Sequence, residues 1–155
     1  MNRIEIWTDG GCEPNPGFGG WAAVIIGDDG DKAEMFGHAS NTTNQRMELT
    51  APIAALELMP TDIPIVVHSD SKYVVDGIRL WVPGWKANGW QRGTARKPQP
   101  VANLDLWKRL EEVASARMVT WQWVKGHAGN EWNERADELA GLARLEGVRQ
   151  AAVTA

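Results

Sequence analysis

Four carboxylates stand where separate parts of the chain could meet. Asp9 ends a strand-like run before a glycine turn, and Asp70 ends another strand at the start of a helix. In α/β sheets, ligands bind in the crevice outside the carboxyl ends of the strands. Glu48 and Asp137 lie on helical segments that could reach the same crevice. Clustered acids are typical of catalytic sites, although each acid taken singly is more typical of a helix cap or a solvated charge.

Hydrophobic periodicity predicts the elements that position these acids. Arg3–Thr8 alternates apolar and polar residues as a strand does, and the glycine- and proline-rich residues 10–20 form a turn. Trp21–Gly27 and Lys32–His38 read as two further strands around the turn GDDGD, which completes an antiparallel meander.

Helices and short apolar strands alternate in the rest of the chain. Helices are predicted over Thr43–Leu58, from Ser71 to about Trp81, over Leu104–Ala114 and over Glu131–Arg144, and strands over Ile65–His68 and Met118–Val124. This order predicts an α/β fold whose sheet mixes the antiparallel meander with parallel strands. Residues 147–155 lack periodicity, so we expect a domain over residues 1–146 and a weakly ordered C-terminal tail.

Composition is that of one ordinary globular domain. The chain has 155 residues, and its single cysteine, Cys12, cannot form an internal disulfide. No apolar run approaches the roughly 20 residues that a membrane-spanning helix needs. No signal peptide precedes the first strand. We therefore expect a cytoplasmic protein that does not bind membranes.

The distribution of charge is more informative than the net charge of −4. Between Asp76 and Asp105 there are five basic residues and no acidic one, which leaves −9 for the remainder of the chain. Three of the nine tryptophans also lie in this segment. A basic, aromatic-rich patch on an acidic body favours a nucleic-acid contact.

Four motifs carry a resemblance to a known family. TDGGCEPNPGFGGW, TTNQRMELT, SDSKYV and WVKGHAGNEWNERADELA occur in this order. Together they resemble the type 1 ribonuclease H family in its short bacterial form, from about Arg3 to about Arg144. The resemblance implies a five-stranded mixed sheet of order 3-2-1-4-5 flanked by helices, which agrees with the elements predicted above.

The same resemblance implies an endonuclease that hydrolyses the RNA strand of RNA/DNA hybrids and leaves 5′-phosphate and 3′-hydroxyl ends. The family's metal-binding carboxylates match Asp9, Glu48, Asp70 and Asp137, and its loop histidine matches His127. Asp9 would bridge two ions, Glu48 would bind one ion and a ribose 2′-OH, and Asp70 would hold the ion beside the attacking water. Asp137 would complete the other ion's ligands. A lone exposed histidine usually has no role, whereas here the resemblance implies that His127 shuttles a proton or helps release product.

Metal binding follows from the same set of acids. Four acids in one crevice repel each other and raise one another's pKa values unless cations intervene. All-oxygen ligands suit a hard cation, so Mg²⁺ is expected, with Mn²⁺ as a substitute. The resemblance implies two such ions per site. Paired cysteines and closely spaced histidines are absent from the sequence, which argues against a typical zinc site.

The resemblance also assigns substrate contacts near the first acid. Backbone groups around Gly11 and Cys12, with Asn15 and Glu48, match positions that contact the 2′-OH groups that distinguish RNA from DNA. Further matches, at positions that hold a DNA phosphate or touch the minor groove, are Asn15, Thr43, Asn44 and Gln45. Thr43 and Asn44 could equally be helix caps.

Some positions depart from the family's usual residues. Gln45 replaces a common asparagine, Lys72 a common glutamine and Asp76 a common amide, and these changes affect groove contacts rather than chemistry.

Residues 81–97 match the family's basic protrusion, which grips the DNA strand. We expect Trp81 to lie nearer the DNA, and Trp85 and Trp90 mainly to pack the protrusion. Lys86 is retained, but the two residues after it lack the Lys or Arg common in relatives. With fewer basic side chains to contact phosphates, we expect hybrid binding to be weaker and less dependent on salt than in more basic relatives.

Two alternative functions remain on the residues alone. A non-catalytic nucleic-acid binding module would use the tryptophans but not four acids beside phosphates. An integrase or junction resolvase would share the acids but not TTNQRMEL, the protrusion or KGHAGNE. We expect the protein to act as a monomer without an obligate protein partner.

Overall fold

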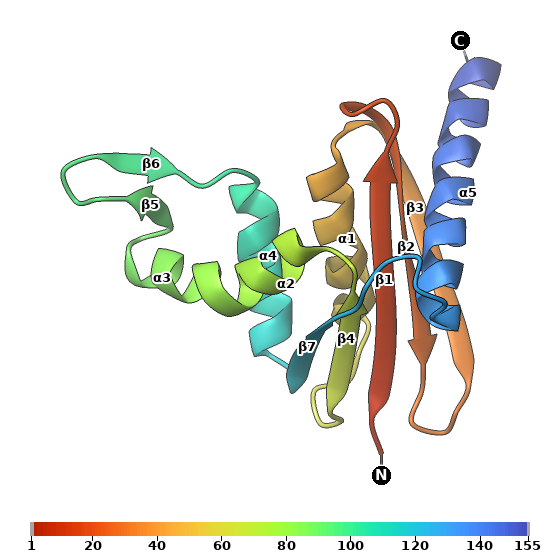
Figure 1. Cartoon of the computed structure of the whole chain (residues 1–155), viewed down its shortest axis with the longest axis horizontal. Coiled ribbons are helices and arrows are strands. Elements are labelled where there is room, and N and C mark those ends of the chain that lie inside the picture. The colour runs from red at the N-terminus through yellow and green to blue at the C-terminus, as the bar shows by residue number, and fades with distance from the viewer. Residues whose placement is uncertain (1, 155) are drawn as a thin grey trace.

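A mixed β-sheet forms the centre of the molecule (Figure 1). The computed structural model describes residues 2–154. The sheet has five strands in the order β3-β2-β1-β4-β7. Their bounds are β1 Ile4–Cys12, β2 Gly17–Ile26, β3 Lys32–Thr42, β4 Ile65–Ser69 and β7 Val119–Trp123. β2 pairs antiparallel with both β1 and β3, whereas β4 runs parallel to both β1 and β7. The predicted strand order is confirmed, with β7 as the fifth strand.

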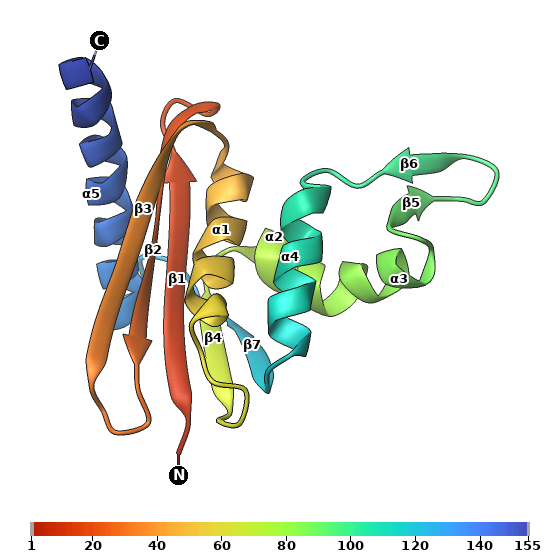
Figure 2. The same cartoon turned by 180° about the vertical axis from the view of Figure 1, so that it is seen from behind.

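Helices cover the two faces of the sheet unequally (Figures 1 and 2). α5, Glu131–Thr154, lies alone on one face. The opposite face carries α1, Asn44–Glu57, and α4, Leu104–Ser115. Thr43 caps α1 through its hydroxyl, which accepts a hydrogen bond from the Arg46 N–H at 3.2 Å. The helix remains continuous across the buried Pro52, although this residue has no N–H to donate to the Glu48 carbonyl.

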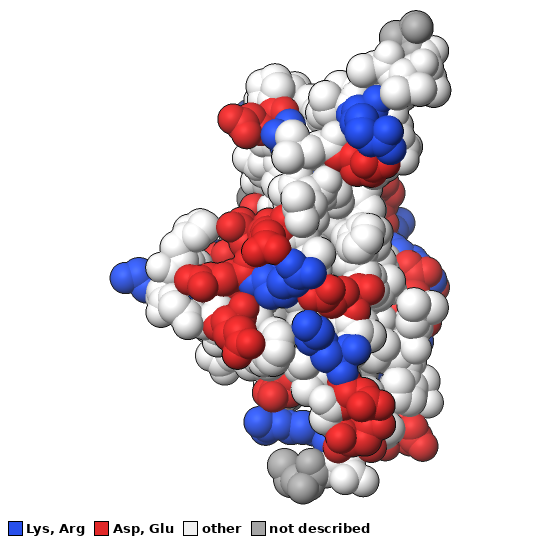
Figure 3. Space-filling view, turned by 90° about the vertical axis from the view of Figure 1, so that its right-hand side faces the viewer, with Lys and Arg blue, Asp and Glu red and all other residues white. Residues whose placement is uncertain are grey.

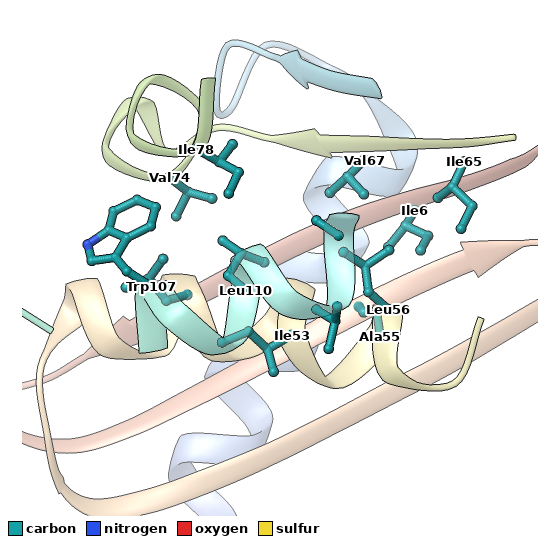
Figure 4. Close-up of a cluster of buried hydrophobic side chains, with 14 of the residues drawn as sticks. Ile6, Ile53, Ala55, Leu56, Ile65, Val67, Val74, Ile78, Trp107 and Leu110 are labelled. Carbon is teal, nitrogen blue, oxygen red and sulfur yellow. The ribbon is translucent and has the colours of Figure 1, made fainter. Parts of the chain in front are cut away.

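Two hydrophobic cores share strand β1. The larger one lies between the sheet and α1 and α4, and includes Ile6, Leu56 and Trp107 (Figure 4). The smaller one lies beneath α5 and includes Trp7 and Leu139. Ile6 and Trp7 enter different cores because successive side chains of a strand point to opposite faces. The same alternation decides which acids face which helix.

The segment that carries the protrusion leaves the sheet after β4 and extends away from it (Figure 1). The segment begins with α2, Lys72–Asp76, and a π-helical turn, Gly77–Trp81, and the protrusion then contains α3, Val82–Ala87. A hairpin follows, with β5 at Gln91–Gly93 and β6 at Pro98–Pro100. The sequence predicted a single helix to about Trp81 and no hairpin. Both hairpin strands have three exposed residues, so no apolar alternation could reveal them.

The C-terminal helix differs from its predicted extent. α5 continues to Thr154 instead of ending near Arg144, so residues 147–154 are helical rather than weakly ordered. Gly147 is buried against the His38 ring of β3, where a Cβ would come within 2.8 Å of Nδ1. Arg149 adds an ion pair to Glu146 one turn earlier. The sequence could not show this because the stabilising neighbour lies on a distant strand. None of the helices in the described chain is long and apolar enough to span a bilayer.

Candidate active site

Strands β1 and β4 run side by side into the candidate site, where β4 ends at Ser69, whereas β1 continues to Cys12 instead of ending before the glycine-rich residues as the sequence predicted. Thr8 of β1 pairs in parallel register with Ser69 of β4, so Asp9 and Asp70 are the next residues along each strand. Both acids share the strand parity of Trp7, which lies beneath α5. α5 brings Asp137 to the same hollow, where its carboxyl group helps to raise the pKa of Asp9. Three of the four predicted carboxylates therefore meet on the α5 side of the sheet.

Asp9 lies at the electrostatic centre of this group. Burial raises the pKa of its carboxyl to about 9, and the neighbouring carboxyl groups of Asp70 and Asp137 contribute to the rise. The backbone N–H of Gly10 acts in the opposite direction. Without a cation, Asp9 would hold a proton at neutral pH to relieve this repulsion. The donor set thus has the chemistry of a site for a hard cation.

Glu48 approaches from the other side of β1. Gly10 allows α1 this close approach, because a Cβ on Gly10 would lie 2.7 Å from the Glu48 backbone nitrogen. The Glu48 carboxylate accepts a hydrogen bond from the Ser71 hydroxyl at 2.5 Å. Burial raises the pKa of Glu48, while the Ser71 bond lowers it and the charge of Asp70 raises it. The fourth predicted carboxylate is therefore near Asp70 but turned toward Ser71.

The predicted site residues line two adjoining hollows. The acidic hollow has a volume of about 320 Å³ and is lined by residues that include Asp9, Gly11, Cys12, Asp70, His127, Asp137 and Arg144. The polar hollow has a volume of about 820 Å³ and is lined by residues that include Asn15, Thr43, Asn44, Gln45, Glu48, Asp70 and Lys72. Asp70 borders both hollows, so it joins the acids to the amide-rich surface beside α1.

Asp9, Asp70 and Asp137 line the acidic hollow, but their carboxylates do not converge on one point. Within residues 2–154, no three Asp, Glu, His or Cys side chains converge closely enough to hold one ion as they stand. One oxygen of Glu48, Oε2, is hydrogen-bonded to the Ser71 hydroxyl. The all-oxygen chemistry fits a divalent cation, and side-chain rotation is needed to complete a set of ligands.

Hydrogen bonds tie the turn after β1 to the start of α1. The Cys12 N–H donates to Asn44 Oδ1 at 2.7 Å, and the Asn44 N–H donates to Asn15 Oδ1 at 3.2 Å. Thr43 uses its hydroxyl to cap α1, as the alternative interpretation predicted. The structure thus brings these four predicted substrate-binding residues together where the two hollows adjoin, with Cys12 on the acidic hollow, Asn15 and Thr43 on the polar hollow and Asn44 on both. The helix N-terminus there favours anions.

The two lysines predicted to contact substrate, Lys72 and Lys86, already contact side chains of the protein itself. Lys72 Nζ lies 4.9 Å from the ring centre of Trp123, whose indole N–H donates to the Asp70 carbonyl at 3.1 Å. On the protrusion, Lys86 Nζ forms an ion pair with Glu111 at 2.6 Å.

The tryptophans of the protrusion differ in exposure. Trp81 is 38% exposed, whereas Trp85 and Trp90 pack against the larger core. The ring centres of Trp85 and the buried Trp107 are 5.6 Å apart. This agrees with the expectation that Trp85 and Trp90 mainly pack the protrusion.

His127 lies in the exposed loop between β7 and α5 and borders the acidic hollow. Its φ of 54° is a left-handed conformation that few non-glycine residues adopt. The loop thus places His127 on the hollow that the three aspartates also line.

Sequence reasoning missed three residues at this site. Asn133 is 2% exposed, and its Nδ2 donates to Asp70 Oδ2 at 3.4 Å. Asn103 borders the polar hollow and donates to the Tyr73 hydroxyl at 3.0 Å. Arg144 borders the acidic hollow. The only signal for Asn133 was its position in the NEWNE run, and nothing near Asn103 or Arg144 indicated their neighbours.

A comparison with family models decides the family. The model described as RNase H matches residues 1–144. The chain belongs to the ribonuclease H family. A protein named Ribonuclease H from Granulibacter bethesdensis is 51% identical over 146 residues, which cover 94% of this chain and 95% of the relative. One from Cupriavidus pinatubonensis is 48% identical, covering 94% of this chain and 99% of the relative.

Solved ribonuclease H structures share the fold. LC9-RNase H1, described as a type 1 RNase H with the type 2 active-site motif, has a TM-score of 0.79 and 29% identity, covering 93% of this chain and 72% of that one. LC11-RNase H1, solved in complex with RNA/DNA hybrid, has a TM-score of 0.70 and 24% identity, covering 94% of this chain and 99% of that one. These likenesses agree with the mixed sheet and its strand order.

Proposed function

We propose that this protein is an endonuclease that hydrolyses the RNA strand of RNA/DNA hybrids and leaves 5′-phosphate and 3′-hydroxyl ends. The observation that carries the proposal is the meeting of Asp9, Asp70 and Asp137 at one hollow, in a chain of the ribonuclease H family. A hybrid-bound structure of LC11-RNase H1, which has the same fold, supports the substrate class.

Asp9, Glu48, Asp70 and Asp137 would hold the metal, which we propose to be two Mg²⁺ ions with Mn²⁺ as a substitute. When bound, the ions supply positive charge at the attacked phosphate and at the leaving 3′ oxygen. The raised pKa of Asp9 supports this assignment, because a carboxyl held protonated by its neighbours is relieved by a cation.

The protein's own groups orient the substrate. Asp70, held by the amide of Asn133, accepts a hydrogen bond from the attacking water and so orients it toward the phosphate. Glu48 exchanges its bond with the Ser71 hydroxyl for one from a ribose 2′-OH, a group that DNA lacks. His127, on its exposed loop, carries a proton as the product leaves.

The polar hollow would receive the DNA strand. The N-terminus of α1, with Thr43 and Asn44, provides a partial positive charge for a backbone phosphate. Asn15 and Gln45 border the same hollow, and the protrusion with Trp81 and Lys86 extends the contact along the strand. Gly11 and Cys12, on the acidic hollow, face the RNA strand.

The test is cleavage of a uniform hybrid with labelled RNA in Mg²⁺, beside matched RNA/RNA and DNA/DNA duplexes. We expect cleavage of only the hybrid's RNA strand, with 5′-phosphate ends, abolished by chelator. Asp70→Asn should reduce kcat at least about 1,000-fold, because several kcal/mol of charge stabilisation are lost. Binding of hybrid without cleavage in both Mg²⁺ and Mn²⁺ would contradict the proposal and favour a binding module.

We also propose that the protein acts as a monomer in the cytoplasm, without an obligate protein partner. Its single cysteine, which offers no internal disulfide to stabilise an exported domain, supports this location. Sedimentation equilibrium at the concentrations used for cleavage should give a mass near 17.1 kDa. A mass of twice that value would contradict the monomer.

A further inference from the structure

One basic residue borders the acidic hollow. Among the residues described, Arg144 is the only Lys or Arg in its lining. Arg144 follows Asp137 by seven residues on α5, with Gly141 between them on the same face of the helix. Seven residues of α-helix rise about 10 Å, and helical side chains lean toward the N-terminus. Asp137 and Arg144 therefore border the same hollow about two helical turns apart.

The backbone of Arg144 is held close to the sheet. A Cβ on Gly20 of β2 would lie 2.6 Å from the Arg144 nitrogen and would overlap the Ala140 carbonyl. Gly20 pairs with Gly11 of β1, which also borders the acidic hollow. Absence of a side chain at Gly20 thus lets α5 approach the sheet and sets the position of Arg144.

The wall between Asp137 and Arg144 is open. Ala140 and Gly141 border the hollow there, and a Cβ on Gly141 would have no atom within 4 Å. An extended strand can therefore lie along this turn of α5 without meeting a large side chain.

The guanidinium is only partly engaged. Arg144 Nη1 donates to the Glu13 carbonyl at 3.2 Å, and Nη2 lies 3.9 Å from a Glu13 carboxylate oxygen. The Glu13 side chain is 82% exposed, so this ion pair is well solvated. A guanidinium carries five N–H donors, which leaves several for another acceptor.

Phosphate is the acceptor that this geometry favours. Three aspartates repel an approaching polyanion, and a planar guanidinium fork matches the oxygens of phosphate. Because the aspartates act on the RNA strand, the phosphate belongs to that strand. The rise of about 10 Å from Asp137 corresponds to about one to three nucleotides.

We propose that Arg144 is a substrate-positioning residue that binds an RNA-strand phosphate about one to three nucleotides from the one that is cut. This role rests on the proposed hydrolysis of RNA/DNA hybrids. It assigns α5 to substrate binding as well as to supplying Asp137.

The first test separates binding from chemistry. In Arg144→Gln, we expect KM for hybrid to rise about tenfold, with kcat changed less than about twofold, because a charge-assisted bond is lost away from the reacting atoms. The slope of log KM against log salt should fall by about one. Arg144→Lys should recover most of the loss. Arg149→Gln is the matched control, since it removes the same charge from α5 at a residue paired with Glu146.

The second test locates the phosphate. Wild-type and Arg144→Gln chains, each also carrying Asp70→Asn to prevent cleavage, bind hybrids with one neutral methylphosphonate at successive 2′-O-methyl positions of the RNA. Each hybrid is compared with the same oligonucleotide bearing an ordinary phosphate. We expect the affinity difference between the two proteins to vanish at one or two adjacent linkages.

Three results would overturn the inference while leaving the proposed function intact. These are unchanged KM and salt slope in Arg144→Gln, an affinity difference that survives every neutral linkage, and a KM increase in Glu13→Gln equal to that in Arg144→Gln. The last would show that Arg144 only fastens the turn at Glu13. Absence of hybrid cleavage by the wild-type chain would instead refute the proposed function and the inference together.

Discussion

At the scale of single residues, the candidate site depends on which face of β1 each acid reaches. Asp9 points toward α5 and meets Asp137, whereas Glu48 arrives from α1 and is hydrogen-bonded to Ser71. Asp70 borders both hollows. Asp9, Asp70 and Asp137 therefore repel one another at the acidic hollow, whereas Glu48 is hydrogen-bonded to the neutral hydroxyl of Ser71.

His127 provides the first prediction at this scale. His127→Ala should lower kcat about 100-fold, the low end of general acid–base contributions, because the ring moves a proton but holds no metal. Asp137→Asn should lower it more. Single-turnover and steady-state rates at several Mg²⁺ concentrations would measure both. A His127→Ala chain as inactive as Asp137→Asn under all of them would contradict the assigned role.

At the scale of elements, close approaches at glycine place the helices. α5 meets β2 at Gly20, and α1 meets β1 at Gly10. A side chain at either position would displace the helix that supplies an acid to the site. Positioning of the acids is therefore encoded partly by residues that have no chemistry of their own.

Gly20→Ala should reduce the free energy of unfolding by about 1–3 kcal/mol, because the added methyl meets backbone atoms of α5 that cannot rotate away. Gly84→Ala is the matched control. Its Cβ would meet no atom within 4 Å, and alanine should stabilise α3 by up to about 1 kcal/mol. Urea denaturation measures both changes. Equal stability of the two variants would show that α5 can shift at no cost.

An ion pair between α1 and α4 predicts a pH dependence. Arg46 donates two hydrogen bonds to Asp105, at 3.0 and 2.8 Å, and these lower the pKa of Asp105. A lowered folded-state pKa stabilises the fold above the unfolded pKa of about 3.9, and this contribution disappears as pH falls through the folded value. The Asp105 side chain is 66% exposed, so solvent screening limits the contribution to about 1 kcal/mol or less.

The Asp105→Asn variant should therefore have a lower free energy of unfolding than the wild type at pH 7. This difference in free energy should disappear as the pH falls toward about 3. Urea denaturation across this pH range provides the measurement. A difference that stays constant down to the lowest pH would mean that the carboxylate charge does not contribute.

At the scale of the whole molecule, charge is arranged so that a polyanion has few places to bind. Figure 3 shows acidic and basic side chains interspersed on the face that carries α5. Ion pairs such as Arg135 with Glu34 and Arg149 with Glu146 account for part of this mixture. The basic segment lies instead on the protrusion, at the opposite end of the molecule from α5 (Figure 1). A hybrid would thus extend from the acidic hollow toward the protrusion.

Lys86 gives the prediction at this scale. Glu111→Gln removes the carboxylate that pairs with Lys86, so hybrid binding should tighten several-fold and the salt slope should steepen by about one. Glu112→Gln is the control, because Glu112 lies next along α4 and pairs with Arg109. Binding by the Asp70→Asn chain at several salt concentrations measures the slopes. Identical slopes for both glutamine variants would show that Lys86 does not contact substrate.

The sequence by itself determined the five strands of the sheet, the main helices and most of the residues that border the site. Strand alternation, the Thr43 cap and the four motifs are local patterns, and they assigned Asp70 to a strand end and Asp9 to the first strand, although that strand continues to Cys12. These local patterns suffice because strand parity gives the face of the sheet on which each residue lies. The strand order implied by the family resemblance then gives which strands are neighbours.

Only the tertiary structure decided what each side chain meets. The bond of Glu48 to Ser71, the extension of α5 beyond Arg144 and the place of Arg144 beside the acids all depend on partners distant in sequence. Such contacts follow from how closely helices approach the sheet at Gly10 and Gly20. Periodicity carries no information on that distance, because it reports which face of an element is buried and not what packs against it.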